Sequence, residues 1–273
     1  MPDHPDVLQF LKLGGSLITD KTSPHTPRLD VLRRLAGEVA NTCRGVDGLK
    51  LLIGHGSGSF GHVPASRYNT RQGVHTPSEW RGFVEVWREA AALDHMVIDA
   101  FSTAGLPVIA FPPSSGLIAS GGQVEAWDLS PIEMALQSGI IPIIFGDVIF
   151  DRRLGGTIFS TEDLFDHLAR RLRPRRILLA GLEAGVWADY PRCNELVDEI
   201  TPDNLKHVTP FLGGSAATDV TGGMLSKVGQ SLSLVQSIPG LQVWIFSGVI
   251  PGLVERALAG EPVGTLIHAG RPE

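Results

Sequence analysis

The sequence predicts an α/β protein, an open αβα sandwich with a mostly parallel central sheet. Three observations support this fold class. Short apolar runs alternate along the chain with amphipathic stretches. The runs are continuously aliphatic, as is typical of strands that are buried on both faces of a sheet. Two of the runs lead directly into glycine-rich loops, which is how strands end in folds of this class.

Six apolar runs are predicted as strands of the central sheet. They cover residues 7–13, 49–53, 108–111, 140–145, 177–180 and 243–246. Six amphipathic segments between or after them are predicted as helices with right-handed crossovers. These cover residues 28–43, 78–104, 131–137, 161–172, 224–236 and 253–259. Two hairpins interrupt the alternation, one at residues 120–123 and one at residues 151–156, between short strands at 148–150 and 157–159.

Length and composition indicate a soluble globular protein. The 273 residues are 43% hydrophobic and 19% charged, enough for a large core in a single domain over residues 1–273. A soft division into two lobes is expected near residue 173. The net charge of −6 argues against general binding of nucleic acid, which needs a basic face. It leaves room for an anionic small ligand held by a few local lysines.

Several features predict a cytoplasmic protein. Cys43 and Cys193 form neither a zinc motif nor a disulfide framework, which favours a reducing compartment. The first six residues lack the basic and apolar regions of a signal peptide. The apolar run 140–145 is far too short to span a bilayer.

The two glycine-rich loops are the strongest functional signal. The first covers residues 12–21 (KLGGSLITDK) and the second residues 54–62 (GHGSGSFGH). Small residues between a strand and a helix point backbone N–H groups beyond the edge of the sheet, and that arrangement binds phosphate. Two such loops predict two phosphate-bearing ligands, or one ligand that is held from both sides.

Lysine usage supports the same interpretation. The chain has only five lysines against eighteen arginines, and Lys12, Lys21 and Lys227 all lie in glycine-rich segments. Lysine is a compact, mobile point charge that can follow a migrating phosphoryl group, whereas arginine is a rigid fork. The alternative is chance placement of these three residues.

Taken together, the motifs resemble the amino-acid kinase superfamily and, within it, the isopentenyl phosphate kinases. The resemblance runs nearly end to end, and the order and spacing of the pieces make it specific. The pieces are residues 12–16 with Lys21, 58–62, 82–86, 113–115, 146–147, 160–163, and 219–224 with Lys227. The resemblance implies an amino-acid kinase-like fold, ATP-dependent phosphorylation of isopentenyl phosphate to isopentenyl diphosphate, and a homodimer.

The resemblance also implies site residues. In the acceptor lobe, residues 1–172, the substrate would contact Gly56, Ser57, Gly58, Gly61, His62, Phe83, Val86, Gly146 and Asp147. In the nucleotide lobe, residues 173–273, and the first loop, ATP would contact Gly14, Gly15, Ser16, Gly181, Gly185, Gly222, Gly223 and Lys227. The catalytic set would be Lys12, Lys21, Asp163 and Lys227. No protein cage for a metal is predicted, so Mg²⁺ is expected to travel with ATP.

Three side chains have two interpretations each. Asp163 could accept hydrogen bonds from Lys12 and Lys227, and it could also be a carboxylate that complements a helix dipole, two interpretations that are compatible. His62 is expected to bind the acceptor phosphate, because an ionised phosphate needs no general base; the alternative is a loop histidine without a ligand. Phe83, with Val86 and Trp87 on one helical face, could pack in the core or form the wall of a pocket for a five-carbon tail. His55 is expected to be structural.

Two departures from the family pattern keep other functions open. Residues 180–187 lack the threonine and both aspartates of a Thr-Asp-x-Asp-Gly motif, and Ser57 stands where glycine is usual. The first departure bears on nucleotide preference and the second on the shape of the substrate-phosphate site. The alternatives are a phosphonate kinase of the fosfomycin-resistance type and a nucleotide-binding regulatory protein without catalysis. The residues around Phe83 favour an apolar tail over the first, and the retained lysines argue against the second.

Overall fold

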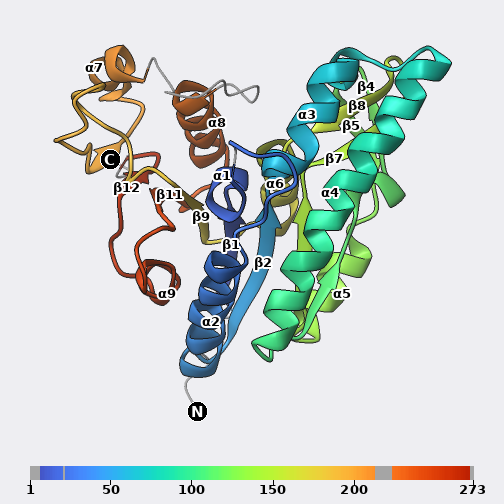
Figure 1. Ribbon diagram of the computed structural model, residues 1–273. Helices are drawn as coiled ribbons and strands as arrows, with labels where there is room; N and C mark the ends of the chain where they lie inside the picture. Colours follow the sequence, from blue (N-terminus) through green and yellow to red (C-terminus); the bar gives the residue numbers. More distant parts are fainter. Residues whose placement is uncertain (1–6, 21, 213–222, 271–273) are drawn as a thin grey trace.

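The computed structural model describes residues 7–20, 22–212 and 223–270, and its centre is an eight-stranded sheet (Figure 1). The strand order is β10-β12-β11-β9-β1-β2-β6-β3. Every neighbouring pair of these strands is parallel except β11 with β12. The strands are β1 (Val7–Leu13), β2 (Leu49–His55), β3 (Val108–Ala110), β6 (Ile141–Phe145), β9 (Arg176–Gly181), β10 (Glu199–Ile200), β11 (Gln242–Ser247) and β12 (Thr265–Ile267).

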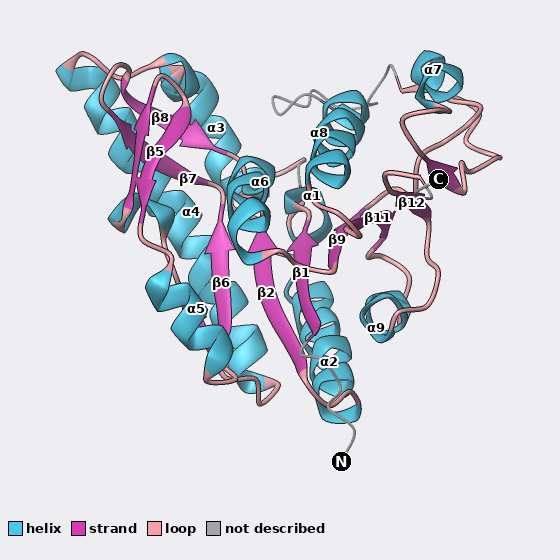
Figure 2. Ribbon diagram, turned by 180° about the vertical axis from the view of Figure 1, so that it is seen from behind, coloured by secondary structure: helices cyan, strands magenta, loops and turns pink. Residues whose placement is uncertain are grey.

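Helices cover both faces of this sheet, as Figures 1 and 2 show from opposite sides. One core contains Leu11 of β1 with apolar side chains of α2 (Leu29–Gly45), α4 (Pro77–Thr103) and α9 (Leu253–Ala259). The other contains Phe10 of β1 with side chains of three further helices. These are α5 (Ser130–Gln137), α6 (Thr161–Leu172) and α8 (Gly223–Ser237). Because successive residues of a strand face opposite sides, β1 supplies both cores, and the predicted αβα sandwich is confirmed.

A second sheet, with strand order β5-β4-β7-β8, forms beside the first. Its strands are β4 (Leu117–Ser120), β5 (Gln123–Trp127), β7 (Asp147–Asp151) and β8 (Gly155–Phe159). Both predicted hairpins are confirmed. The Asp151 carboxylate ties their two turns together, since it accepts backbone N–H groups from Gly121, Gly122, Arg153 and Leu154. These hydrogen bonds outweigh the burial that raises the pKa of Asp151, and its pKa ends below the ordinary value.

Several short elements were not predicted: α1 (Gly15–Ile18), α3 (Gly58–Tyr68), α7 (Leu205–Val208), β10, β12 and three 3₁₀ turns. Of these, α3 matters most for function, because it begins inside the second glycine-rich loop. Strands from both sides of residue 173 share the central sheet, since β9 pairs with β1. Across the described ranges, no helix combines the length and the apolar character needed to cross a membrane.

A row of glycines marks the carboxyl edge of the central sheet. Gly14, Gly56 and Gly146 directly follow β1, β2 and β6, and Gly181 is the last residue of β9. The register aligns them: Gly14 N–H donates to Ala180 O over 2.8 Å, and Gly146 N–H donates to His55 O over 3.2 Å. Ligands of open α/β sheets bind beyond this edge, and the small residues leave it uncovered.

Candidate active site

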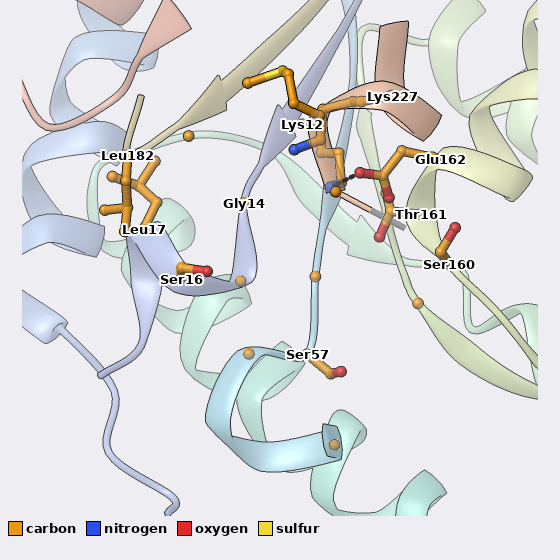
Figure 3. Close-up of a pocket in the computed structure, with 18 of the residues that line it drawn as sticks. Lys12, Gly14, Ser16, Leu17, Ser57, Ser160, Thr161, Glu162, Leu182 and Lys227 are labelled. Carbon is orange, nitrogen blue, oxygen red and sulfur yellow. Dashed lines mark hydrogen bonds and ion pairs between the residues drawn. The ribbon is translucent and has the colours of Figure 1, made fainter. Parts of the chain in front are cut away.

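One large cavity, of about 800 Å³, lies beyond the glycine edge of the sheet. Both glycine-rich loops line it, together with the first residues of α6 and α8. Figure 3 shows Lys12 and Glu162 together beside Thr161 and Ser160, with Leu182 on the other side of Gly14. The cavity therefore brings together residues from the two ends of the chain.

The two glycine-rich loops pack directly on each other. A Cβ added to Gly15 would lie 2.5 Å from the backbone nitrogen of Gly58. Gly58 has φ +51°, and a Cβ there would lie 2.1 Å from Thr19 Oγ1, whose hydroxyl accepts the Ser59 N–H over 2.9 Å. Any larger residue at Gly15 or Gly58 would push the loops apart. The close contact thus fixes the positions of the two loops relative to each other.

Helix N-termini give the cavity a positive character. The first turns of α3, α6 and α8 all contribute lining residues: Gly58 and Gly61, Thr161 and Glu162, and Gly223 and Met224. The unpaired N–H groups of a first helical turn and the helix dipole both favour an anion. Three such ends around one cavity suit a ligand with several phosphate groups.

Lys12 and Glu162, which both line the cavity, form an ion pair. Their side chains are only 11% and 17% exposed. Burial by itself raises the pKa of Glu162, but the hydrogen-bonded Lys12 ammonium and the charge of Lys227 outweigh it, so the pKa lies below its ordinary value. Glu162 is therefore ionised near neutral pH and fixes the position of the Lys12 ammonium beside the glycine-rich loops.

The prediction that Asp163 accepts from Lys12 is wrong, and the neighbouring Glu162 does so. Asp163 is the N3 residue of a capping box: its Oδ2 accepts the Ser160 N–H over 2.9 Å, and its own N–H donates to Ser160 Oγ. Its carboxylate also contacts Arg71, at 3.3 Å, and Gln230, at 3.3 Å. The alternative interpretation, a carboxylate at the start of a helix, is the one that the structure supports.

The cavity collects most of the other residues that the sequence pointed to. Val86 and all but a few of the predicted loop residues line it. The full set of predicted residues in its lining is Lys12, Gly14, Gly15, Ser16, Gly56, Ser57, Gly58, Gly61, Val86, Gly146, Gly181, Gly223 and Lys227.

Three predicted contact residues lie away from this lining. Phe83 is 4% exposed and packs in a small core with Val74, Val86 and Val148, so it is a core residue in this structure. Asp147 is fully buried, where it accepts the N–H groups of Ser114 and Val148; burial raises the pKa of its carboxyl to about 6.

Gly185, predicted to contact the nucleotide, is the third. It is buried against Thr265, and an added Cβ would lie 2.6 Å from the threonine hydroxyl. Trp87 also differs from the predicted shared face with Phe83 and Val86, since it is 43% exposed. His55 is structural as predicted: it is fully buried, and its Nε2 lies 3.0 Å from Asp94 Oδ1.

Lys21, Gly222 and the side chain of His62 lie outside the described part of the structure. Their roles therefore stay predictions from the sequence. Lys227 of α8 lines the cavity with Glu162, and its contact with the nucleotide stays a prediction.

Several lining residues were not found from the sequence. From the sequence, the role of Glu162 was assigned to its neighbour Asp163. The pattern Ser160-Thr161-Glu162-Asp163 is a capping box, in which the fourth residue hydrogen-bonds the start of the helix, and this signal could have pointed to Glu162 instead. Trp187 and Tyr190 come from an irregular loop after β9 that carries no periodic signal. Arg71 comes from a 3₁₀ turn after α3, and nothing in the sequence pattern points to it.

The two ends of the cavity differ in chemistry. On the side of α3, α4 and β8 the apolar lining is mostly aliphatic, from Ala65, Val86 and Ile158, with one aromatic residue, Phe159. On the side of the loop after β9 it includes the aromatic side chains Trp187 and Tyr190. The Lys12–Glu162 pair belongs to the same cavity. One end thus suits a small aliphatic group, and the other suits a flat ring.

The carboxylates of the cavity are already engaged. Glu162 pairs with Lys12, and Glu183 Oε2 accepts the Trp187 indole N–H over 2.8 Å. Within residues 7–20, 22–212 and 223–270, no three His, Cys, Asp or Glu side chains gather in a way that could hold a metal ion.

Comparisons with known proteins agree with this geometry. The model of the amino acid kinase family matches residues 8–247. The isopentenyl phosphate kinase of Methanothermobacter thermautotrophicus is 36% identical over 271 residues, covering 94% of this chain and 98% of the relative. The isopentenyl phosphate kinase of Arabidopsis thaliana is 31% identical over 229 residues, covering 78% of this chain and 68% of the relative.

Solved structures extend the similarity to three dimensions. An X-ray structure of isopentenyl phosphate kinase has a TM-score of 0.79 at 32% identity, and the match covers 95% of this chain and 99% of the other. A product complex of the T. acidophilum isopentenyl phosphate kinase has a TM-score of 0.76 at 25% identity, with 96% and 100% covered. The chain therefore belongs to the amino acid kinase family and, within it, to the isopentenyl phosphate kinases.

Proposed function

We propose that this protein transfers the γ-phosphoryl group of ATP to the phosphate of isopentenyl phosphate, which yields ADP and isopentenyl diphosphate. The observation that carries the proposal is the single cavity in which both glycine-rich loops meet the Lys12–Glu162 pair. Its apolar end, at Ala65, Val86, Ile158 and Phe159, fits a five-carbon tail. The family and its named members support the same substrate.

In this mechanism the protein positions two anions and stabilises charge. An oxygen of the acceptor phosphate bonds to the γ-phosphorus, and the bond from that phosphorus to the β–γ bridging oxygen breaks and leaves ADP. Because the acceptor is already ionised, no side chain has to remove a proton. Lys12, fixed by Glu162, and Lys227 neutralise the charge of the transferring group, and the N–H groups of the two loops hold the outer phosphates.

The division of labour across the cavity is part of the proposal. The acceptor would occupy the side built by residues before 173, and ATP the side built by residues after 173 together with the first loop. Lys21 and His62 would contact the phosphates, and His62 would act on the acceptor. Mg²⁺ would be held by the ATP oxygens, since the carboxylates of the cavity already have protein partners.

We further propose that the enzyme is a cytoplasmic homodimer. Cys43 and Cys193 are free thiols, which fits a reducing cytoplasm. A homodimer follows from the resemblance and would cover exposed apolar side chains such as Val84 on α4, which is 58% exposed. Light scattering on the purified protein would test the dimer.

A coupled assay of ADP release tests the proposed activity. Three reactions are compared: ATP with isopentenyl phosphate, ATP with fosfomycin, and ATP with no acceptor. We expect turnover that depends on isopentenyl phosphate. Turnover with fosfomycin alone would favour a phosphonate kinase, and nucleotide binding with no turnover would favour a regulatory protein.

A further inference from the structure

Arg71 is a cation of the cavity that the proposed mechanism leaves without a task. Among the residues that the structure describes, three positively charged side chains line the cavity, and the other two are Lys12 and Lys227. Lys12 pairs with Glu162, and the charge of Lys227 acts on the same carboxylate. With Glu162 counted, the two lysines offer less positive charge than a ligand with several phosphate groups carries negative charge. A third cation at the cavity is therefore well placed to bind such a ligand.

The backbone of Arg71 is fixed beside the cavity. Arg71 is the middle residue of the 3₁₀ turn η1 (Thr70–Gln72), which follows α3 directly after Asn69, a residue with φ +52°. The carbonyl oxygen of Arg71 accepts the hydroxyl of Thr157, on β8, over 3.0 Å. Asn69 and Gln72 also line the cavity. The side chain of Arg71 therefore starts from a fixed point, and its own rotations decide what the guanidinium contacts.

The contact between the guanidinium and Asp163 is weak. Arg71 Nη2 lies 3.3 Å from Asp163 Oδ2, and the Arg71 side chain is 44% exposed. The same oxygen accepts two shorter hydrogen bonds from Ser160, over 2.9 Å from its backbone N–H and over 2.8 Å from its hydroxyl. The other oxygen of Asp163 accepts from Gln230. Asp163 thus keeps these partners if Arg71 leaves, and the release of a half-exposed ion pair costs little.

Arg71 also lies where the two sides of the proposed site meet. A second cavity, of about 40 Å³, shares Arg71, Glu162 and Lys227 with the large one. Arg71 belongs to the part of the chain before residue 173, which forms the proposed acceptor side, and Lys227 belongs to the part after it, which forms the proposed nucleotide side. In the proposed reaction, the γ-phosphoryl group of ATP is what passes from one side to the other.

We propose that Arg71 leaves Asp163 when ATP binds and holds the γ-phosphoryl group during its transfer. The inference rests on the proposed kinase function and adds a third cation to Lys12 and Lys227. A guanidinium is a planar fork of N–H donors, so it can bind two oxygens of one phosphate at once, whereas an ammonium acts as a point charge. Arg71 forms no covalent bond and transfers no proton, because arginine stays charged in proteins. Its part is to balance negative charge while the phosphoryl group moves.

The test uses Arg71→Gln, with Arg67→Gln as the matched control. Arg67 lies on α3 outside the cavity lining, is 60% exposed and forms an ion pair of similar length with Glu85, at 3.4 Å. Loss of one electrostatic contact in the transition state costs about 10²–10³ in rate. Arg71→Gln should therefore lower kcat by about a hundredfold and melt at the same temperature as Arg67→Gln, which should keep the wild-type kcat. Arg71→Lys should recover part of the loss, since it keeps the charge but not the fork. An Arg71→Gln variant with kcat near wild type would overturn the proposal.

Asp163→Asn distinguishes a direct contact of Arg71 with the phosphoryl group from an indirect effect. This variant removes the charge that Arg71 contacts in the structure and keeps Arg71 itself. If Arg71 binds the phosphoryl group, Asp163→Asn keeps kcat within a few-fold of wild type. If Arg71 only anchors the start of α6 through Asp163, then Asp163→Asn and Arg71→Gln lose the same amount of kcat, and that result would also overturn the proposal.

Binding of ATP and of ADP without an acceptor separates this proposal from the proposed activity. Isothermal titration calorimetry with the magnesium complexes of both nucleotides gives their Kd values. A hydrogen bond between charged groups contributes roughly ten- to a hundredfold in affinity. Arg71→Gln should raise the Kd for ATP by that factor and leave the Kd for ADP unchanged, because ADP has no γ-phosphate, and Arg67→Gln should change neither. This readout tests Arg71 even if isopentenyl phosphate is not phosphorylated. The same ratio of the two Kd values in wild type and in Arg71→Gln would contradict the role of Arg71 alone.

Discussion

Replacing Glu162 by glutamine should disable catalysis while leaving the fold intact. The pair that Glu162 forms with Lys12 is only 11% and 17% exposed, and Lys227 also acts on the same carboxylate. A glutamine keeps the shape and can still accept one hydrogen bond, but it removes the negative charge that holds Lys12. Loss of one preorganised electrostatic contact costs about 10²–10³ in rate. We expect kcat to fall by about a hundredfold, which is about 2.7 kcal/mol of transition-state stabilisation.

Asp163→Asn is the matched control, one residue further along the same helix turn. Asp163 caps α6 and contacts Arg71, whose side chain is 44% exposed. Loss of a helix cap costs about 0.5–2 kcal/mol, and a surface ion pair adds about 1 kcal/mol at most. This variant should melt several degrees lower and keep kcat within a few-fold of wild type. Lys12→Ala should match or exceed the loss seen in Glu162→Gln.

The assay is steady-state kinetics with both substrates varied, together with thermal melting of each variant. The expected pattern separates a kcat defect in Glu162→Gln from a stability defect in Asp163→Asn. The reasoning is refuted if Asp163→Asn loses as much kcat as Glu162→Gln, because Asp163 would then be the residue that positions the lysines. It is also refuted if Glu162→Gln turns over at the wild-type rate.

Three other perturbations test separate parts of the site. Phe83→Ala should cost about 3–5 kcal/mol of stability, because Phe83 is 4% exposed in a core. It should leave the preference for isopentenyl phosphate over geranyl phosphate unchanged. A switch in preference to geranyl phosphate would show that Phe83 forms a wall of the pocket. His62→Ala should lower kcat/KM for the acceptor by roughly one to two decades and leave the KM for ATP constant. His62→Asn should recover part of the loss. If His62→Ala raises only the KM for ATP, the assignment of the two loops to the acceptor and to ATP would have to be reversed. The pKa of Asp147 rises from 3.8 to about 6 on folding. The folded state therefore binds a proton at this carboxyl more tightly than the unfolded state does. The stabilisation that results is present at low pH and is lost as the pH rises from about 4 through 6. Melting of wild type and of Asp147→Asn over that range should show this slope in the wild type only, and equal slopes would contradict it.

Most of the fold could be predicted because its elements are long, regular and apolar. β1 (Val7–Leu13), α6 (Thr161–Leu172) and α9 (Leu253–Ala259) begin and end at the predicted residues, since capping residues and glycines mark their boundaries. β10 (Glu199–Ile200) and β12 (Thr265–Ile267) escaped prediction. They are so short that their pairing is decided by tertiary contacts rather than by a local pattern.

The site residues that could be predicted from the sequence are mostly those that act through their backbone. Glycines at strand ends reveal themselves in the sequence, and most of those predicted line the cavity. Side chains were harder to place. Whether Glu162 or Asp163 reaches Lys12 depends on a rotation of one residue about α6, which the capping box at Ser160 decides. Phe83 and Val86 are one helical turn apart and share a small core, yet only Val86 also lines the cavity.

The central claim is the transfer of a phosphoryl group from ATP to the phosphate of isopentenyl phosphate. Phosphorus-31 NMR of the purified protein with these two compounds and Mg²⁺ observes that transfer directly. The account predicts that ADP and a new prenyl diphosphate appear in equal amounts as ATP and isopentenyl phosphate disappear, and that Lys12→Ala abolishes both signals. Release of inorganic phosphate with the prenyl monophosphate unchanged, or no reaction at all by wild-type enzyme, would contradict it.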